Sequence, residues 1–441
     1  MPTTAIILAA GLGTRMKSAL PKACHPIAGR PMLHHLIDSV RDVFDRIVVV
    51  IGPDMPQLAA IAAPHSVIVQ HERLGTAHAA LLAAEHFGDD EVAILYADNP
   101  LITPGTLRAL TQRRGRGDVG LALVAMRPDD PGRYGRVIGD DGYVERVVEW
   151  ADANAGEQAV TLCNAGVLCA PGPAMRRWLR AVGRDNAQGE YYLTDVVALA
   201  RAEGALVAFV EAPFAELRGI NSRAELAEAE AEVQRRLRLA AMEAGVTMTA
   251  PETVFLCADT RLAPDVSIGP HVVFGPGVTV ESGAEILPFC HFVGAHIGPG
   301  AIVGPYARLR PGTRVGAGAH VGNFVELKNT TLSDGAKANH LSYLGDADIG
   351  AKTNVGAGTI TCNYDGYMKY RTTIGSGVFV GSHAVLVAPL TIGDGAFIAA
   401  GSVITDNVAP DAMAFGRARQ ETRPGRAADF RAARAAAKAK T

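Results

Sequence analysis

An aliphatic residue recurs about every six positions from residue 251 onward, and glycine often follows it. Each six-residue unit predicts one short strand and one turn, and three such units predict one coil of a parallel β-helix. Glycine suits the turns because it tolerates unusual backbone angles. The predicted inward side chains are Ile268, Phe274, Val280, Ile286, Phe292, Ile297, Val303, Leu309, Val315, Val321, Leu327, Leu344, Ile349, Val355, Ile374, Val380, Leu386, Ile392, Ile398 and Ile404.

The six-residue register breaks at three places: residues 292–297, residues 327–344 and, most plainly, residues 361–373. A break in a regular repeat implies an inserted loop, and loops on a rigid scaffold often carry function. Taken alone, the repeat fits a purely structural scaffold as well as it fits a platform for acyl transfer.

Residues 4 to about 220 follow a different pattern, in which short apolar runs alternate with helical patterns such as 31–43 and 76–86. This alternation predicts an α/β domain with a mainly parallel sheet and helices on both faces. Ligands of such sheets bind beyond the carboxyl ends of the strands. The predicted strands are 6–8, 47–51, 67–69, 92–96, 121–126 and 206–210.

Four segments follow from these patterns. We expect an α/β domain over residues 1–221 and a linking region over 222–250, whose helix starts at a capping box formed by Ser222 and Glu225. The β-helix then covers residues 251–423. A basic, Ala-rich tail over residues 424–441 is expected to be a frayed helix or disordered.

The composition argues against several classes of protein. The formal net charge is −3, which gives no general reason to expect nucleic acid as a partner. No apolar run is long enough to span a membrane, and the N-terminus lacks the features of a secretory signal. The six cysteines form no C-x-x-C pair, which suits reduced thiols in a cytoplasm.

The stretch "LAAGLGTRMKSALPK" (8–22) follows the first predicted strand. Its glycines let backbone N–H groups approach phosphate oxygens, while Arg15 and Lys22 supply positive charge. The stretch resembles the signature of the sugar-1-phosphate nucleotidyltransferases. Further segments resemble that family in the same order: "QHERLGTAHA" (70–79), "YADNPL" (96–101), "GRYGRV" (132–137), "VVEWAD" (147–152), "CNAGV" (163–167), "NAQGEYYLTD" (186–195) and "LRGINSR" (217–223).

The resemblance implies that a phosphate oxygen of a sugar 1-phosphate attacks the α-phosphorus of a nucleoside triphosphate and that pyrophosphate leaves. It implies Mg²⁺ held by Asp98 and Asn221, with Arg15 and Lys22 as catalytic cations. The nucleotide and sugar contacts that it implies are Leu8, Ala9, Ala10, Gly11, Gln70, Gly75, Thr76, Gly135, Glu149, Asn164 and Asn221, with Glu190 and Tyr192 as further candidates.

Four segments of the second half narrow the resemblance: "ARLRPG" (307–312), "HVGNFVELKN" (320–329), "KANHLSYLGDA" (337–347) and "NVGAGTITCNYDG" (354–366). They resemble the bacterial family of bifunctional N-acetylglucosamine-1-phosphate uridyltransferases / glucosamine-1-phosphate N-acetyltransferases over about residues 4–420. The resemblance implies acetyl transfer from acetyl-CoA and uridylyl transfer from UTP, in the supply of UDP-N-acetylglucosamine for peptidoglycan and lipopolysaccharide. It also implies a left-handed β-helix, a homotrimer and a cytoplasmic location.

The same resemblance assigns His340 as the base of acetyl transfer, and an imidazole titrates in the range that this role requires. His340 is expected in a register break beside Lys328 and Tyr343. Arg310 and Lys328 would clamp the sugar phosphate, while Tyr343 and Asn354 would contact the sugar. The acetyl-CoA contacts that the resemblance implies are Ala357, Asn363, Tyr364, Ser382, Ala400 and Arg417, with backbone N–H groups near Ala357 and Ser382 facing the thioester oxyanion.

Four residues depart from the family pattern: Ala97, where glycine is usual, Asn99 after the metal-binding aspartate, Trp150 after Glu149, and Asn339 before His340. Two other interpretations stay open at this point. One is a nucleotidyltransferase of different specificity whose β-helix only regulates or oligomerises. The other is a non-enzymatic scaffold, such as the exchange-factor subunits of translation initiation that combine the same two domain types.

Overall fold

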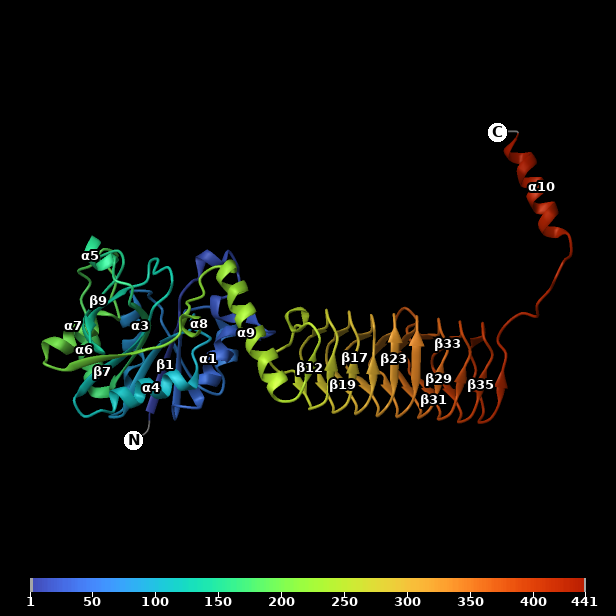
Figure 1. Cartoon of the computed structure of the whole chain (residues 1–441), viewed down its shortest axis with the longest axis horizontal. Coiled ribbons are helices and arrows are strands. Elements are labelled where there is room, and N and C mark those ends of the chain that lie inside the picture. The colour runs from blue at the N-terminus through green and yellow to red at the C-terminus, as the bar shows by residue number, and fades with distance from the viewer. Residues whose placement is uncertain (1–2, 440–441) are drawn as a thin grey trace. The chain divides into compact units, whose positions relative to one another are not determined.

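The computed structural model describes residues 3–439, which form two compact units (Figure 1). One unit extends to Leu239, and the other begins at Ala240. Within the described residues, no helix is both long enough and apolar enough to cross a membrane.

A nine-stranded sheet forms the centre of the first unit, in the order β5-β4-β1-β6-β10-β7-β11-β9-β8. β10 and β9 run opposite to the other strands, so the predicted mainly parallel sheet is confirmed. The strands β8, β9 and β10 do not coincide with any predicted strand. The strands are β1 (Thr3–Ala9), β4 (Arg46–Ile51), β5 (Ser66–Val69), β6 (Glu91–Tyr96), β7 (Val119–Met126), β11 (Leu206–Glu211), β8 (Arg136–Asp140), β9 (Tyr143–Val148) and β10 (Cys163–Pro171).

Helices cover both faces of this sheet, because alternate residues of its strands enter two hydrophobic clusters. Ile7 packs in the cluster that contains Leu33 and Leu107, whereas Ile6 packs in the one that contains Trp178. The helices are α1 (Met32–Arg41), α2 (Pro56–Ala62), α3 (Thr76–Leu82), α4 (Pro104–Arg114), α5 (Ala155–Gln158), α6 (Gly172–Ala181), α7 (Asp195–Ala202), α8 (Phe214–Leu217) and α9 (Arg223–Glu243), with 3-10 turns η1 (Thr14–Met16), η2 (Lys22–Cys24) and η3 (Ala84–His86) and a short hairpin of β2 (Pro26–Ile27) and β3 (Arg30–Pro31).

The start of α9 differs in one respect from the predicted capping box. Ser222 Oγ accepts a hydrogen bond from the backbone N–H of Glu225 at 3.2 Å, as expected. The Glu225 carboxylate, however, accepts from the N–H of Asn221 at 2.6 Å rather than from that of Ser222. The helix cap therefore also fixes the backbone of Asn221.

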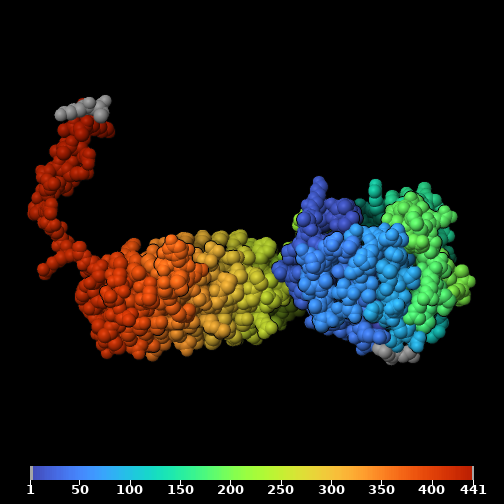
Figure 2. All heavy atoms as spheres, turned by 180° about the vertical axis from the view of Figure 1, so that it is seen from behind, coloured from blue at the N-terminus to red at the C-terminus, as the bar shows by residue number. Residues whose placement is uncertain are grey.

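The second unit is a column of coils with three parallel sheets, drawn from yellow to red in Figure 1 and close-packed in Figure 2. Face 1 contains β12 (Thr247–Met248), β14 (Ser267–Ile268), β17 (Glu285–Ile286), β20 (Ile302–Val303), β23 (His320–Asn323), β26 (Lys337–His340), β29 (Asn354–Val355), β32 (Phe379–Val380), β35 (Phe397–Ile398) and β37 (Met413–Ala414).

Faces 2 and 3 complete each coil. Face 2 contains β15 (Val273–Phe274), β18 (His291–Phe292), β21 (Arg308–Leu309), β24 (Glu326–Lys328), β27 (Tyr343–Gly345), β30 (Ile360–Cys362), β33 (Val385–Val387) and β36 (Val403–Ile404). Face 3 contains β13 (Arg261–Leu262), β16 (Thr279–Val280), β19 (Ala295–Ile297), β22 (Thr313–Val315), β25 (Thr331–Leu332), β28 (Ala347–Ile349), β31 (Thr372–Ile374) and β34 (Leu390–Ile392), and the 3-10 turn η4 (Pro251–Thr253) lies before the first full coil.

Every predicted inward side chain of the repeat is buried, which confirms the register. Two of the three predicted insertions are wrong. Residues 292–297 and 327–344 stay within regular coils, where buried Leu332 and Ala338 occupy inward positions. Each of these breaks is a corner shortened by one residue, where Gly294 and Asn329 take positive φ angles of 54° and 47°. Asp346 repeats this feature one coil after Asn329, with a φ of 48°. Only residues 361–373 contain an insertion, between β30 and β31.

The tail forms helix α10 (Arg426–Lys438), in which no residue is buried. Of the two expectations for this segment, a helix or disorder, the structure shows the helix. Residues 440–441 lie outside the described part of the chain.

Candidate active sites

A cavity of about 440 Å³ opens at the carboxyl ends of β1 and β6 in the first unit. This is the edge at which doubly wound sheets bind ligands. Tyr96 lines the cavity, and so do Glu190 and Tyr192, which the sequence offered as further candidates. The predicted site residues that line the cavity are Leu8, Ala9, Ala10, Gly11, Lys22, Gln70, Gly75, Thr76, Asp98 and Glu149.

Lys22, Asp98 and Asn221 meet at this cavity although they are far apart in the sequence. The Lys22 ammonium donates to Asp98 Oδ2 at 2.6 Å and to Asn221 Oδ1 at 3.0 Å. The backbone joins the two oxygen donors as well, since the N–H of Ile220 donates to the carbonyl of Asp98 at 2.9 Å. The predicted cation-binding pair and the lysine predicted to be catalytic thus form one cluster.

Asn99 supports this cluster from behind. Its side-chain amide is buried and donates to the carbonyls of Ala165 at 3.1 Å and Leu217 at 2.8 Å. These two bonds link the segment after β6 to β10 and to the end of α8. The departure at position 99 therefore has a structural role, which is to anchor the loop that carries Asp98.

The oxygen donors at this site suit a hard divalent cation. Asp98 Oδ1 is buried and has no hydrogen-bond partner, and the carboxylate and amide oxygens of Asp98 and Asn221 are ligand types that Mg²⁺ prefers. Within residues 3–439, no group of three or more His, Cys, Asp or Glu side chains forms a complete metal site. The chain thus offers two ligands, and the others would be substrate phosphate oxygens and water.

Glu149 lines the cavity, and two further predicted sugar contacts, Gly135 and Asn164, lie beside it rather than in the cavity lining. The N–H of Asn164 donates to the carbonyl of Gly135 at 2.8 Å, and the Glu149 carboxylate accepts from Thr194 Oγ1 at 3.0 Å. A Cβ atom at Gly135 would lie 3.2 Å from Glu149 Oε2, so glycine leaves room for that carboxylate. Burial raises the pKa of Glu149, and the nearby charges of Asp195 and Asp152 add to the effect.

The buried Arg136 holds the loop before this sugar region. Its guanidinium donates to the carbonyls of Gly132 at 2.9 Å, Pro131 at 3.3 Å and Gln158 at 3.2 Å. The same group lies 4.7 Å from the centroid of the Trp150 ring, so Trp150 covers an arginine by a cation–π contact. This contact explains the aromatic residue at position 150.

Two cations of the first unit depart from expectation. Arg15 is exposed and does not line the cavity, so the structure does not bring it together with Lys22. Arg73, which the sequence analysis missed, lines the cavity and donates from Nε to the carbonyl of Ala10 at 2.9 Å. Its position within the stretch 70–79, two residues before Gly75, is the sequence signal that would have identified it.

In the second unit, four predicted residues lie on one corner of successive coils, together with Asn323. At this corner, the backbone carbonyl of each residue accepts a hydrogen bond from an N–H group of the next coil. The carbonyls of Asn323, His340, Ala357 and Ser382 accept from Leu341, Gly358, His383 and Gly401, respectively. Asn323, His340, Ala357, Ser382 and Ala400 form this line, which we call the base line. Coils stack at about the 4.8 Å spacing of strands, so the line runs along the column.

His340 is not in a register break, which corrects the prediction. It ends the regular strand β26 and pairs in register with Asn323 of β23. Its Nδ1 lies 2.9 Å from Asn323 Oδ1. Because that oxygen accepts, Nδ1 carries the proton and the Nε2 lone pair stays free for a base. Asn323 was missed, although it lies 17 residues before His340, one coil earlier.

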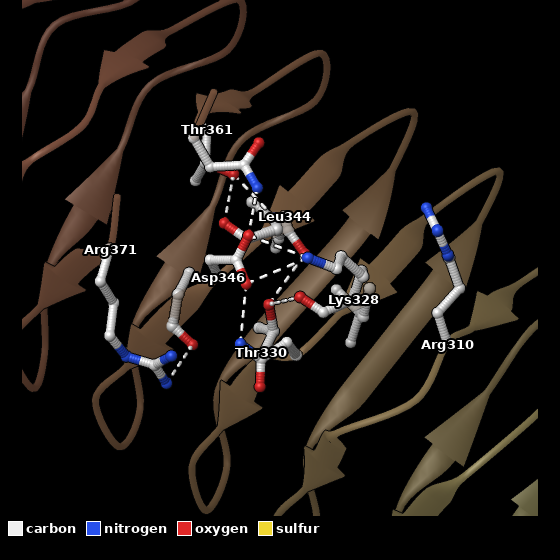
Figure 3. A network of polar contacts seen from close by, with 12 residues as sticks. Arg310, Lys328, Thr330, Leu344, Asp346, Thr361 and Arg371 are labelled. Carbon is white, nitrogen blue, oxygen red and sulfur yellow. Dashed lines mark hydrogen bonds and ion pairs between the residues drawn. The ribbon is translucent and has the colours of Figure 1, made fainter. Parts of the chain in front are cut away.

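Asp346 is the centre of a polar network that the sequence analysis also missed (Figure 3). It accepts from Lys328 Nζ at 3.1 Å, from Asn329 Nδ2 at 2.7 Å and from the side-chain amide of Asn363. Burial alone would raise the pKa of Asp346, but the bonds from Asn329, Lys328 and Asn363 together hold that pKa below its usual value. The network fixes the Lys328 ammonium at the end of β24.

The remaining predicted residues of this site are divided between faces 1 and 2 and the loops next to them. Arg310 lies one coil before Lys328, since its N–H donates to the Leu327 carbonyl, and its guanidinium pairs with Glu326 at 2.9 Å. Tyr343 lies in β27 of the same face, whereas Asn354 belongs to face 1. Tyr364 in the insertion is exposed, and so is Arg417 beyond β37.

The two units define a class of protein: a nucleotidyltransferase joined to a hexapeptide-repeat acyltransferase. Residues 5–229 match the family model of the MobA-like NTP transferase domain, and residues 294–329 and 371–406 match that of the bacterial transferase hexapeptide. The bifunctional protein GlmU of Gluconacetobacter diazotrophicus is 68% identical over 436 residues, covering 98% of this chain and 95% of the relative. That of Acidiphilium cryptum is 63% identical over 431 residues, covering 98% and 99%.

The chain belongs to this family of bifunctional GlmU proteins. It is an enzyme of UDP-N-acetylglucosamine synthesis with uridyltransferase and acetyltransferase activities, and its substrates include a nucleotide and acetyl-CoA. The function and fold class expected from the sequence are thus confirmed. A solved UDP-glucose pyrophosphorylase bound to UDP-glucose covers 54% of this chain and 100% of its own at 17% identity and a TM-score of 0.45, a likeness too distant to support an argument.

Proposed function

We propose that the two activities are divided between the two units, with acetyl transfer on the base line and uridylyl transfer in the cavity. Glucosamine 1-phosphate is acetylated first, and its product then attacks UTP. The observation that carries this division is the cluster of Lys22, Asp98 and Asn221 in the cavity, which is separate in sequence and in fold from His340 and its partners.

In the cavity, a phosphate oxygen of N-acetylglucosamine 1-phosphate attacks the α-phosphorus of UTP and pyrophosphate leaves, so no protein nucleophile is required. Lys22 and Arg73, which line the same cavity, and Arg15 in the loop after β1 neutralise charge on the phosphate oxygens. Asp98 and Asn221 would hold Mg²⁺, which when bound supplies further neutralisation of that charge. Glu149 accepts hydrogen bonds from the sugar.

On the β-helix, His340 Nε2 takes a proton from the amine of glucosamine 1-phosphate as that amine attacks the thioester carbonyl of acetyl-CoA. The amide bond forms, the carbon–sulfur bond breaks, and the thiol of coenzyme A leaves. Arg310 and Lys328 bind the sugar phosphate, while Tyr343 and Asn354 contact the sugar.

Acetyl-CoA is an extended molecule, and the base line supports a matching site. Ala357, Ser382 and Ala400 continue the line away from His340. Acetyl-CoA bound along the column would therefore place its thioester beside His340. Backbone N–H groups near Ala357 and Ser382 are assigned to the oxyanion, and Asn363, Tyr364 and Arg417 to further contacts with the coenzyme.

A homotrimer completes the proposal. The second unit exposes an aromatic ladder, defined as His271, Phe289, Tyr306 and Phe324, whose ring centroids are 5.0, 4.9 and 5.1 Å apart in turn. Phe289, Tyr306 and Phe324 are about half exposed. Exposed apolar patches of this kind mark protein interfaces, and this ladder supports assembly of three copies with the acetyl site between them. Light scattering of the purified protein measures the number of subunits.

One experiment tests the two steps together. Purified protein is mixed with glucosamine 1-phosphate, UTP and Mg²⁺, with and without acetyl-CoA, and nucleotide sugars are identified by mass. We expect UDP-N-acetylglucosamine only when acetyl-CoA is present. Formation of UDP-glucosamine without acetyl-CoA would overturn the order of the steps, and no product from folded protein would overturn the assignment of both sites.

A further inference from the structure

Gln70 follows β5 and reaches the cavity from a buried position. Its backbone N–H donates to the Ile51 carbonyl at 2.8 Å, and the residue is 3% exposed. The residue nevertheless lines the cavity. Its primary amide presents either two N–H donors or a carbonyl acceptor to a ligand, depending on which way the group is turned.

Two acceptors decide how this amide is turned. Gln70 Nε2 lies 3.2 Å from the Gly75 carbonyl oxygen and 3.1 Å from Nδ1 of His78. If the amide were rotated by half a turn, Oε1 would face the Gly75 carbonyl oxygen, and these two hydrogen-bond acceptors would repel each other. With both donors engaged, Oε1 is the polar atom of Gln70 left for a ligand.

The position of His78 is itself well determined. It lies in the first turns of α3, whose start is tied to the segment 191–193 by two bonds: Ala77 N–H to the Tyr191 carbonyl at 2.9 Å, and Leu193 N–H to Thr76 Oγ1 at 3.0 Å. The imidazole also lies against the Tyr191 ring, with centroids 6.3 Å apart. Its Nδ1 accepts from Gln70 only in the neutral form protonated at Nε2.

An acceptor at this place distinguishes pyrimidine bases. Uracil carries a donor at N3, whereas cytosine has an unprotonated N3 that accepts. A site built to accept from a ligand N–H rejects the analogue that lacks it, because the buried acceptor is then left without a partner.

We propose that His78 is a positioning residue that, through Nδ1, holds the Gln70 amide in the orientation that selects a uridine over a cytidine nucleotide. This inference rests on the proposed placement of UTP in the cavity. His78 touches no reacting atom, so its effect falls on nucleotide choice rather than on the chemical step.

The test compares His78→Leu, which removes the acceptor, with His78→Asn, whose Oδ1 lies close to the place of Nδ1. Both variants and the unmodified enzyme are assayed for kcat and KM with UTP and with CTP, using N-acetylglucosamine 1-phosphate. Acetyl transfer by the same preparations reports the folding of the second unit, and a retained kcat with UTP reports that of the first.

For His78→Leu we expect KM for UTP to rise, kcat to stay within about twofold and the UTP-to-CTP ratio of kcat/KM to fall by about tenfold, the value of one hydrogen bond. His78→Asn should retain most of the ratio. An equal loss with both nucleotides, or an unchanged ratio, would overturn the role of His78. An unmodified enzyme without preference for UTP would instead overturn the proposed UTP site.

Discussion

The two sites are assembled in opposite ways. The cavity of the first unit gathers Lys22, Asp98 and Asn221 over sequence separations of 76 and 199 residues. On the β-helix the partners are one coil apart, with 17 residues from Asn323 to His340 and 18 from Lys328 to Asp346. Lys22 and Asp98 of the first set line a cavity, whereas His340 is exposed and the Arg310 side chain is 40% exposed.

This difference follows from how each fold repeats. In a doubly wound sheet, separate loops converge beyond the strand ends and surround a small ligand. In a β-helix, each coil places its residues directly over those of the previous coil, so functional groups form a line on an open face. Such a face suits an extended ligand, and the walls around it must come from an insertion or from another copy of the chain.

The largest expected effect separates the two sites completely. Asp98→Asn removes a charge from the cation-binding pair, and we expect uridylyl transfer to fall by about 10²–10³. His340→Ala should abolish acetyl transfer because no base remains. Each variant should retain the other activity, measured on the same preparation. Loss of both activities in a folded variant would show that the two regions are not independent.

Asp346 tests whether the network at the end of β24 serves the site or only the fold. Asp346→Ala leaves Lys328, Asn329 and Asn363 without their shared acceptor, so we expect KM for glucosamine 1-phosphate to rise by about tenfold and stability to fall by about 2–3 kcal/mol. Asp348→Ala is the matched control, because its ion pair with Arg371 is exposed and should change stability by less than about 1 kcal/mol. Equal effects of the two changes in thermal unfolding would contradict the prediction.

Asn323 sharpens the view of the base line. Without its oxygen, the imidazole of His340 loses its fixed orientation, so Asn323→Ala should lower kcat of acetyl transfer by about tenfold with little change in KM. Asn323→Asp keeps an acceptor for Nδ1–H and should restore the rate, with a shifted pH profile. A normal rate in the alanine variant would mean that other contacts orient the base.

The smallest effect concerns stability and pH in the first unit. Burial raises the pKa of Glu149, so its ionised form destabilises the folded state above the usual value of 4.5. Glu149→Gln should therefore raise the unfolding temperature slightly at pH 7–8, and the gain should vanish as the pH falls below 4.5, where both folded and unfolded enzyme are protonated. Glu145→Gln, at an exposed position of the preceding strand β9, is the matched control.

Much of this architecture was predictable because its signals are local. Every side chain that the period of six predicted to point inward is buried, although Leu332 and Ala338 were missed, and the motif order placed ten of the cavity-lining residues. The misses have physical causes. A shortened coil looks like an insertion in the sequence, although a positive φ at Asn329 or Asp346 keeps the chain in register. β8, β9 and β10 lack long apolar runs of their own, or interrupt them with glycine and asparagine.

The sequence by itself determined the class of each unit and the family, and it supplied the candidate reactive groups, because repeat period and motif spacing are properties of the chain alone. Only the tertiary structure decided which side chains meet: Arg73 rather than Arg15 at the cavity, Asp346 beneath Lys328, Asn323 on His340 and His78 on Gln70. Hydrogen-bond partners are set by distance and direction in space, and the spacing of residues along a chain carries neither.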